Sequence, residues 1–240
     1  MNAGRLIVFG LGAVALAIAL LLGVGGLPPV GDYRGPYGDV VYAIAGPERH
    51  AANAVGALVF DIRAFDTLLE EFILFGSVTG VAVLLRPTRR KGDGSAARTI
   101  ADAADRLVVF LLVGIGVTFG FYVVVHGQIT PGGGFQGGAF LASIPLLVYL
   151  AGGPGVLYRI VPRGLVAGAG AAGALLFAAI GLLGLAAGGA YFENVIPFGP
   201  RKSSIVSGGI IPLLSLASGL EVGAGFALLI RVFLEERLRP

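Results

Sequence analysis

Six long apolar runs divide the chain, and polar or glycine-rich segments separate them. They cover residues 6–27, 67–85, 106–126, 135–150, 165–188 and 205–230. An α-helix needs about 20 residues to cross the hydrocarbon core of a bilayer. The fourth run is shorter than this, so we expect its helix to begin inside the glycine-rich segment that precedes it. The pattern predicts an all-α integral membrane protein with about six transmembrane helices.

The first run follows a single basic residue, Arg5, as the apolar part of a signal peptide does. It is longer than the roughly 7–15 residues of such a region, and no clear small-residue cleavage site follows it. We therefore expect a retained signal-anchor helix. The next segment, residues 28–50, is rich in Pro, Gly and Tyr, which predicts an irregular loop on the outer surface.

Basic residues are unevenly divided between the loops that six spans would create. Twelve of the 17 Lys and Arg residues fall on one side of the membrane and four on the other, while Arg63 lies near the start of the second span. Cytoplasmic loops carry the excess of Lys and Arg, so both termini are predicted to be cytoplasmic. The membrane thus accounts for the net charge of +3, and we expect no nucleic-acid partner.

The longest basic loop, residues 87–105, contains the turn-forming sequence Lys-Gly-Asp-Gly-Ser at positions 91–95. This composition is typical of a linker. We therefore predict a two-span N-terminal segment (residues 1–86), a cytoplasmic linker (87–105) and a four-span C-terminal segment (106–240).

Composition agrees with a membrane protein and excludes several kinds of site. The chain is 56% hydrophobic and 13% charged, whereas a soluble domain has about 25% charged residues. It has no Cys and two His, which excludes disulfides and iron–sulfur clusters and argues against a haem or zinc site. Its serines lack a convincing His/Asp partner. We expect neither a cofactor nor a catalytic centre.

The segment 126–138, His-Gly-Gln-Ile-Thr-Pro-Gly-Gly-Gly-Phe-Gln-Gly-Gly, joins the third and fourth runs. Glycines disfavour helix, and irregular backbone at membrane depth requires protein or a water-filled cavity around it. The segment therefore predicts either an ion path or a tight helix junction. No Lys-Ser/Thr pair follows the glycines, so it is no nucleotide site. Its motif positions are Pro131, Gly132, Gly133, Gly134, Phe135, Gly137 and Gly138.

Glu221 lies near the middle of the sixth run, among small neighbours at Ser218, Gly219 and Gly223. A carboxylate at this depth costs several kcal/mol unless it is neutral, paired or hydrated, and such residues are functional by default. We therefore expect a role in ion translocation. The alternative is a protonated glutamate that holds neighbouring helices together.

Two further glutamates begin the second run. Glu70 follows Thr67 by three positions, which fits a capping box, and a place on an ion path is the alternative. Glu71 points about 100° away from Glu70 on a helix, and we rank it below Glu70 as an ion-path residue. Asp66 is another candidate, although ion pairing near Arg63 would explain it equally well.

His126 closes the third run, and its ordinary pKa near 6.5 suits a proton relay. A histidine at a helix end is also readily stabilised by the helix dipole, so an interfacial residue bonded to a carbonyl of the broken loop remains the alternative.

Two blocks resemble the MnhB domain, which forms one membrane subunit of the Mrp-type multisubunit sodium/proton antiporters. The first is the glycine-rich segment 126–138. The second joins Ser-Gly-Gly-Ile-Ile-Pro at 207–212 to Gly-Leu-Glu-Val-Gly at 219–223. The resemblance covers about residues 101–235. Glu221 stands where many of these MnhB subunits carry Asp.

Residues 53–70 resemble the C-terminal part of the large subunit of the same antiporters. A similar piece is a separate small subunit in membrane-bound hydrogenases and sulfane reductases, whereas here it is fused to the MnhB-like part. Ala64 and Leu69 depart from the expected glycines, and Glu71 is an additional acid.

The resemblance implies an accessory subunit of a sodium/proton antiporter in a prokaryotic cell membrane, which helps to form a path for Na⁺ or protons. Its partners would be the other subunits of the complex, and it would bind no redox cofactor. Two alternatives remain open. One is the equivalent subunit of a respiratory complex of the membrane-bound hydrogenase type, and the other is a purely structural scaffold.

Overall fold

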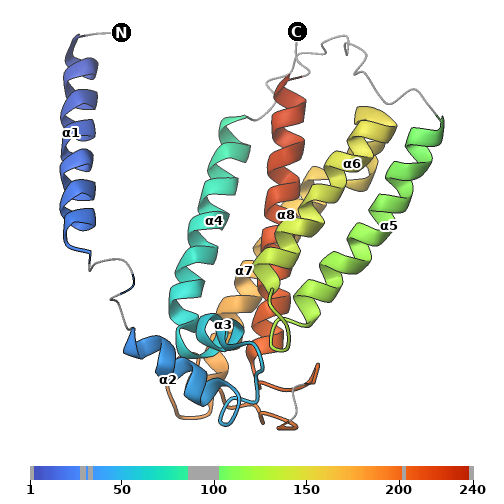
Figure 1. Cartoon of the computed structure of the whole chain (residues 1–240). Coiled ribbons are helices and arrows are strands. Elements are labelled where there is room, and N and C mark those ends of the chain that lie inside the picture. Colours follow the sequence, from blue (N-terminus) through green and yellow to red (C-terminus); the bar gives the residue numbers. More distant parts are fainter. Residues whose placement is uncertain (1–2, 28–30, 32–34, 86–102, 202–203, 238–240) are drawn as a thin grey trace. The chain divides into compact units, whose positions relative to one another are not determined.

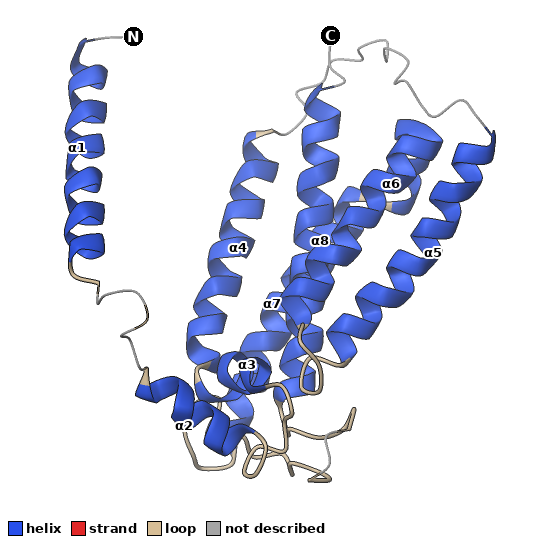
Figure 2. Cartoon of the chain, in the orientation of Figure 1, coloured by secondary structure: helices blue, strands red, loops and turns tan. Residues whose placement is uncertain are grey.

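The computed structural model describes residues 3–27, 31, 35–85, 103–201 and 204–237. These residues form helices and connecting loops and contain no strand (Figures 1 and 2). Six of the helices are long and apolar enough to cross a membrane, which confirms the predicted fold class. Residues 1–40 and 41–240 form two units, and each is described by itself.

The first unit contains α1 (Ala3–Gly25), whose described side chains are almost all exposed and apolar from Ile7 onward. The segment 28–50 is not wholly irregular as predicted, because it includes α2 (Pro36–Ala45). Pro36 occupies the first helical position, where its missing N–H breaks no helical bond. Asp39 in the first turn complements the helix dipole.

In the second unit, α8 (Ile211–Arg237) is the central helix. It packs against α4 (Ala64–Leu84), α6 (Gly134–Ile160) and α7 (Arg163–Ala186), and also touches α5 (Ala103–Val125). Figure 1 shows α4 and α5 on opposite sides of α8. Close to the N-terminus of α4 lie the short helix α3 (Ala54–Ala57) and a π-helical turn, η1 (Leu58–Ile62).

Two helix boundaries differ from the apolar runs for backbone reasons. The sixth run begins at residue 205, but α8 begins at Ile211 because Gly208 and Gly209 adopt positive φ angles of 89° and 63°. The fourth helix begins at Gly134, inside the glycine-rich segment as predicted, and continues to Ile160. It contains a kink at Gly153, which has a non-helical φ of 75° and precedes Pro154.

One end of the bundle is held together by arginines. Arg163 at the start of α7 donates a hydrogen bond to the Ala82 carbonyl of α4 at 2.6 Å and pairs with Glu235 at 3.5 Å. Glu235 also pairs with Arg231 at 2.7 Å. These contacts place the C-terminal ends of α4 and α8 beside the N-terminus of α7, whereas the glycine-rich loop lies at the opposite end (Figure 1).

The predicted linker lies outside the described residues, except for residues 103–105 at the start of α5. α4 belongs to the same unit as α5 to α8 and contacts α7 and α8 directly. The division of the chain at residues 87–105 stays a prediction about its two parts.

Candidate ion-binding site

Three polar side chains tie the glycine-rich loop, or the helix end before it, to other segments of the chain. Asn53, which caps α3, donates hydrogen bonds to the carbonyls of Gly127 at 2.7 Å and Thr130 at 3.0 Å. The buried side chain of Gln128 donates to the Ile205 carbonyl at 2.8 Å, and Ser215 of α8 donates to the Val124 carbonyl at 2.7 Å. Protein groups therefore support this irregular backbone, as irregular backbone at membrane depth requires.

The glycines after this loop create close contacts between helices. A Cβ atom on Gly138 of α6 would lie 2.8 Å from the Gly219 carbonyl oxygen and 2.9 Å from the Gly223 nitrogen of α8. A Cβ on Gly134 would lie 2.7 Å from the Ser218 Cβ, and one on Gly137 would meet α5 at Val124. Of the two interpretations of this segment, its glycines match the tight helix junction.

The rest of the motif shapes the entry into α6. Gly132 and Gly133 have φ angles of 137° and 141°, which side chains rarely adopt. Phe135 is 41% exposed and makes an edge-to-face contact with Phe226 of α8, with ring centroids 6.1 Å apart. The loop thus turns the chain sharply before the glycine seam begins.

Glu221 is buried inside the bundle, with 1% of its surface exposed. Gly173 of α7 makes room for it, since a Cβ there would lie 2.6 Å from the Glu221 nitrogen and 2.8 Å from its Cβ. Neither carboxylate oxygen of Glu221 has a hydrogen-bond partner that meets normal geometry within the described residues. The small residue Gly173 therefore lets α7 close around a buried carboxyl group that has no hydrogen bond of normal geometry to the described residues.

Glu71 of α4 approaches Glu221 from the other side. Its side chain is 2% exposed, and its carboxyl group lies close to that of Glu221 and to the Ser218 hydroxyl, without a hydrogen bond of normal geometry to either. Neither glutamate forms an ion pair within residues 35–85, 103–201 and 204–237. Two carboxylates this close cannot both be ionised without a compensating cation. The pair can therefore hold a shared proton or a small cation.

The sequence ranked Glu70 above Glu71, whereas the structure places Glu71 beside Glu221. Glu70 is exposed on the other side of α4. It is no part of a capping box, because α4 begins at Ala64 and the Thr67 hydroxyl donates to the Val59 carbonyl at 2.6 Å. The capping interpretation is wrong because the π-helical turn places the helix start three residues earlier than Thr67.

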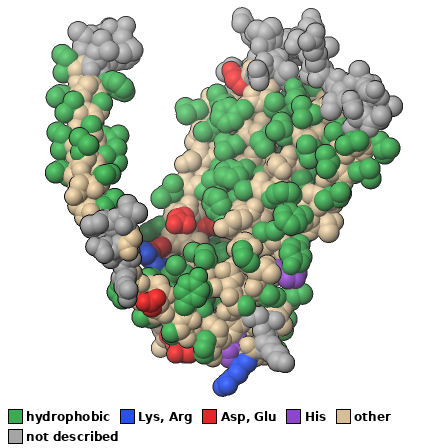
Figure 3. Space-filling view, in the orientation of Figure 1, with side chains coloured by type: hydrophobic (Ala, Val, Ile, Leu, Met, Phe, Trp, Pro, Cys, Tyr) green, Lys and Arg blue, Asp and Glu red, His purple; other side chains and the backbone are tan. Residues whose placement is uncertain are grey.

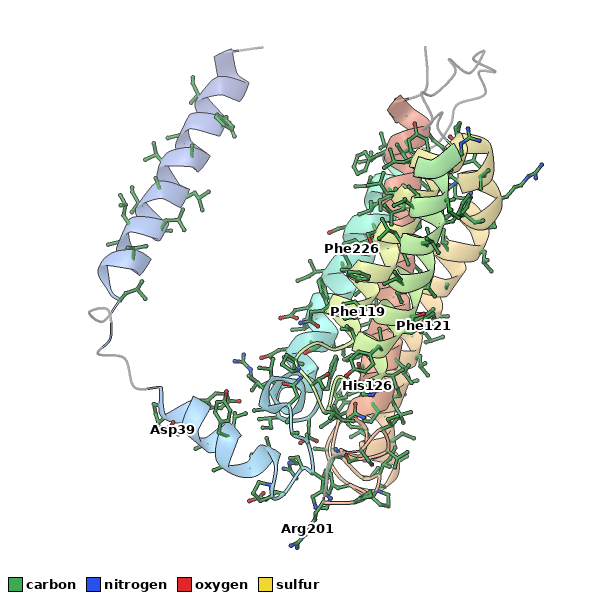
Figure 4. All side chains as sticks on the ribbon, turned by 45° about the vertical axis from the view of Figure 1, so that its right-hand side comes forward. Asp39, Phe119, Phe121, His126, Arg201 and Phe226 are labelled. Atoms are coloured by element: carbon green, nitrogen blue, oxygen red, sulfur yellow. The ribbon has the colours of Figure 1, made fainter. Side chains whose placement is uncertain are left out.

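His126 lies at the end of α5, half-buried beside the glycine-rich loop (Figure 4). Its ring stacks on Tyr122 with centroids 4.0 Å apart, and Nδ1 lies 3.0 Å from the Tyr122 carbonyl oxygen. These contacts hold the ring against its own helix. The carbonyl partner belongs to α5 and not to the broken loop that the interfacial alternative named, and the relay role of His126 stays a prediction.

The acidic groups around the start of α4 are engaged in ion pairs. Asp66 pairs with Arg63, and the buried Asp61 pairs with Arg49 at 2.8 Å. Burial raises the pKa of Asp61, while a hydrogen bond from Asn194 and the charge of Arg49 partly offset this increase. Asp61, Asp66 and Glu193 line a surface depression of about 610 Å³. Figure 3 shows acidic side chains at the surface of this end of the bundle.

Comparisons with known proteins identify the family. The model described as "Domain related to MnhB subunit of Na+/H+ antiporter" matches residues 105–228. An uncharacterized protein of Methanocaldococcus jannaschii is 31% identical over 195 residues, which are 73% of this chain and 74% of that protein. The putative antiporter subunit mnhB2 of Staphylococcus aureus is 48% identical over 50 residues, and the match spans only 21% of this chain and 36% of that protein.

Two solved structures share the fold. A chain of the membrane-bound sulfane sulfur reductase, an archaeal respiratory membrane complex, is 30% identical with a TM-score of 0.69 and coverage of 96% of this chain and 98% of that chain. A chain of the Mrp complex from a Dietzia species is 22% identical with a TM-score of 0.70, and the alignment covers 97% of this chain and 26% of that chain. With six apolar helices and a matching domain over more than half its length, the chain is a multi-pass membrane protein that belongs to the MnhB family.

Proposed function

We propose that this chain is an accessory membrane subunit of a multisubunit Na⁺/H⁺ antiporter and that Glu71 and Glu221 lie on its ion path. The buried pair of carboxyl groups is the observation that carries this proposal. It lies between two membrane-spanning helices without a counter-charge from the described residues, where an unneutralised carboxylate costs several kcal/mol. Exchange of one proton for one monovalent cation would leave the net charge of the pair unchanged.

The other acidic residues would lie on the route by which ions reach this pair. Asp66 and Glu70 lie on α4 between the outer depression and Glu71, and His126 lies at the same end of the bundle. A route from that end would pass Asp66 and Glu70 before it reached the pair, with His126 as a second entry for protons.

A respiratory redox complex is the second candidate, and the likeness to the sulfane sulfur reductase chain over nearly the full length of both chains favours it. The same carboxyl pair would then move ions under the drive of a redox arm carried by other subunits. Purification of the intact complex followed by identification of its subunits distinguishes the two, because iron–sulfur or nickel–iron subunits would be present only in the second.

We expect the chain to be inactive without its partners, because one carboxyl pair makes no continuous path across the bilayer. The chain alone and the whole complex are reconstituted in liposomes, and proton movement is followed with a pH-sensitive dye after a Na⁺ pulse. The complex should respond and the single chain should not. A robust response from the single chain would refute the accessory role. A complete complex that shows no Na⁺-dependent proton movement would refute antiport.

We also propose that the chain resides in a prokaryotic cell membrane with both termini in the cytoplasm. The arginines at one end of the bundle, Arg163 and Arg231, agree with the excess of basic residues expected there. A reporter active only in the cytoplasm, fused after Pro240, should be active. An inactive fusion, together with an active periplasmic reporter at the same site, would invert the topology.

A further inference from the structure

One exposed side of α4 is unusually polar for a surface that faces lipid. Positions that recur at three- and four-residue spacing along this side form what we call the α4 stripe, and they are Asp66, Glu70, Ile73, Ser77, Gly80 and Leu84. Ile73 is 70% exposed and Leu84 is 82% exposed. A Cβ atom on Gly80 would meet nothing within 4 Å, so the space beside this glycine is open.

Other exposed helix surfaces in this chain have a different composition. α1 carries no polar side chain between Leu6 and Gly25. The exposed residues of α5 are mainly large and apolar, as Leu111, Ile115 and Phe121 show. These surfaces are suited to lipid. α5 also has an exposed hydroxyl at Thr118 and an open glycine at Gly114, so the feature that distinguishes the α4 stripe from α1 and α5 is its two acids.

The Glu70 carboxylate gives the polar side of α4 a cost in free energy if it faces lipid. It follows Ala64 by six residues, which places it about 9 Å along the helix axis from the start of α4. No described residue forms a hydrogen bond or ion pair with it, since Arg63 is paired with Asp66. A carboxylate left against hydrocarbon costs several kcal/mol, so a complementary group outside the described residues is expected to cover it.

We infer that the α4 stripe is a docking surface for a transmembrane helix of another protein in the complex, and that this helix presents a basic side chain to Glu70. Gly80 would let the partner backbone approach closely, and Ser77 would form a hydrogen bond between the helices, as small and hydroxyl residues do in membrane interfaces. The apolar span of α1 carries no side chain that could donate to Glu70, so we assign the surface to another protein. The inference rests on the assembly part of the proposed function, and it gives Glu70 a role in assembly in addition to its place on the proposed route.

A photo-crosslinking amino acid placed at Ser77 tests this surface in membranes that contain the complete complex. The expected adduct joins this chain to one transmembrane segment of a co-purifying subunit, with a Lys or Arg within about one turn of the crosslinked residue. The same probe at Ile115 of α5 should react with lipid alone. Adducts to lipid only at Ser77, or to a second copy of this chain, would overturn the inference.

Substitutions supply an independent readout by native electrophoresis of the complex. Gly80→Leu should reduce the recovered complex at least about fivefold, because a bulky side chain blocks close helix approach. Gly114→Leu is the matched control, because Gly114 of α5 is also open and faces no neighbour within 4 Å. Both variants should reach the membrane in equal amounts. Normal assembly of Gly80→Leu would contradict the docking surface.

Variants of Glu70 are assayed only for assembly of the complex. Glu70→Gln keeps an acceptor for the partner's donor and should retain most of the complex, whereas Glu70→Lys places like charges together and should abolish it. Assembly of Glu70→Lys at normal abundance would exclude a basic partner. If Glu70→Lys assembles normally, the docking surface is wrong, but Na⁺-dependent proton flux by the native complex would still support the proposed function. The two proposals can therefore fail separately.

Discussion

Replacing Glu221 with glutamine should leave the complex assembled at normal abundance and reduce Na⁺-coupled proton transport by at least about tenfold. Glutamine keeps the size of glutamate and can still hydrogen-bond to Glu71, but it cannot release a proton. The buried site beside Gly173 should therefore still close around the side chain. Assembly is measured by native electrophoresis and transport in inverted vesicles.

Three comparisons make the Glu221 result specific. Glu221→Asp should retain part of the activity, because the titrating group survives on a shorter stem. Glu236→Gln, an exposed position near the end of the same helix, should transport normally. A scaffold role predicts the opposite order for Glu221→Gln and Glu221→Asp, since glutamine would then be tolerated and aspartate would disturb packing. Full transport by an assembled Glu221→Gln complex would remove this residue from the path.

The second large effect is expected at the glycine seam between α6 and α8. Gly138→Ala places a methyl group within 3.0 Å of backbone atoms of Gly219 and Gly223, which cannot move aside as a flexible side chain can. We expect destabilisation of about 1–3 kcal/mol or more, as for overpacked cores, and a lower thermal midpoint for the purified protein in detergent.

Gly155→Ala is the matched control for this seam. Gly155 lies on the same helix, and a Cβ there meets nothing within 4 Å. The substitution should be neutral or slightly stabilising, because alanine favours helix over glycine by about 1 kcal/mol. Equal thermal midpoints for Gly138→Ala and Gly155→Ala would show that the seam does not depend on close approach of the two backbones.

The parts of the fold that depend on hydropathy and length could be predicted from the sequence. The number of spans and the start of α6 within the glycine-rich segment followed from the requirement for about 20 apolar residues. Helix ends set by backbone geometry did not follow, because the single serine among residues 205–210 does not reveal that Gly208 and Gly209 leave the helical region.

The site was only partly predictable. Glu221 was identified because a lone acid in a long apolar run is expensive wherever the helix packs. The choice between Glu70 and Glu71 depends on which side of α4 faces α8, and periodicity does not decide it because polar residues occur on both sides of this helix. Thr67 and Val78 lie on the same buried side as Glu71, but one is polar and the other is equally suited to lipid. Asn53, Gln128 and Ser215 were missed because their partners are backbone carbonyls distant in sequence.

The carboxyl pair joins two parts of the chain that differ in their relation to the family. Glu221 lies within the MnhB match at residues 105–228, whereas Glu71 lies before it. An MnhB domain expressed from residue 105 onward would therefore carry half of the pair. In the intact chain, covalent connection fixes one Glu71 for every Glu221 and makes their meeting intramolecular. The two carboxyl groups therefore meet in a one-to-one ratio, whatever amount of the protein a cell produces.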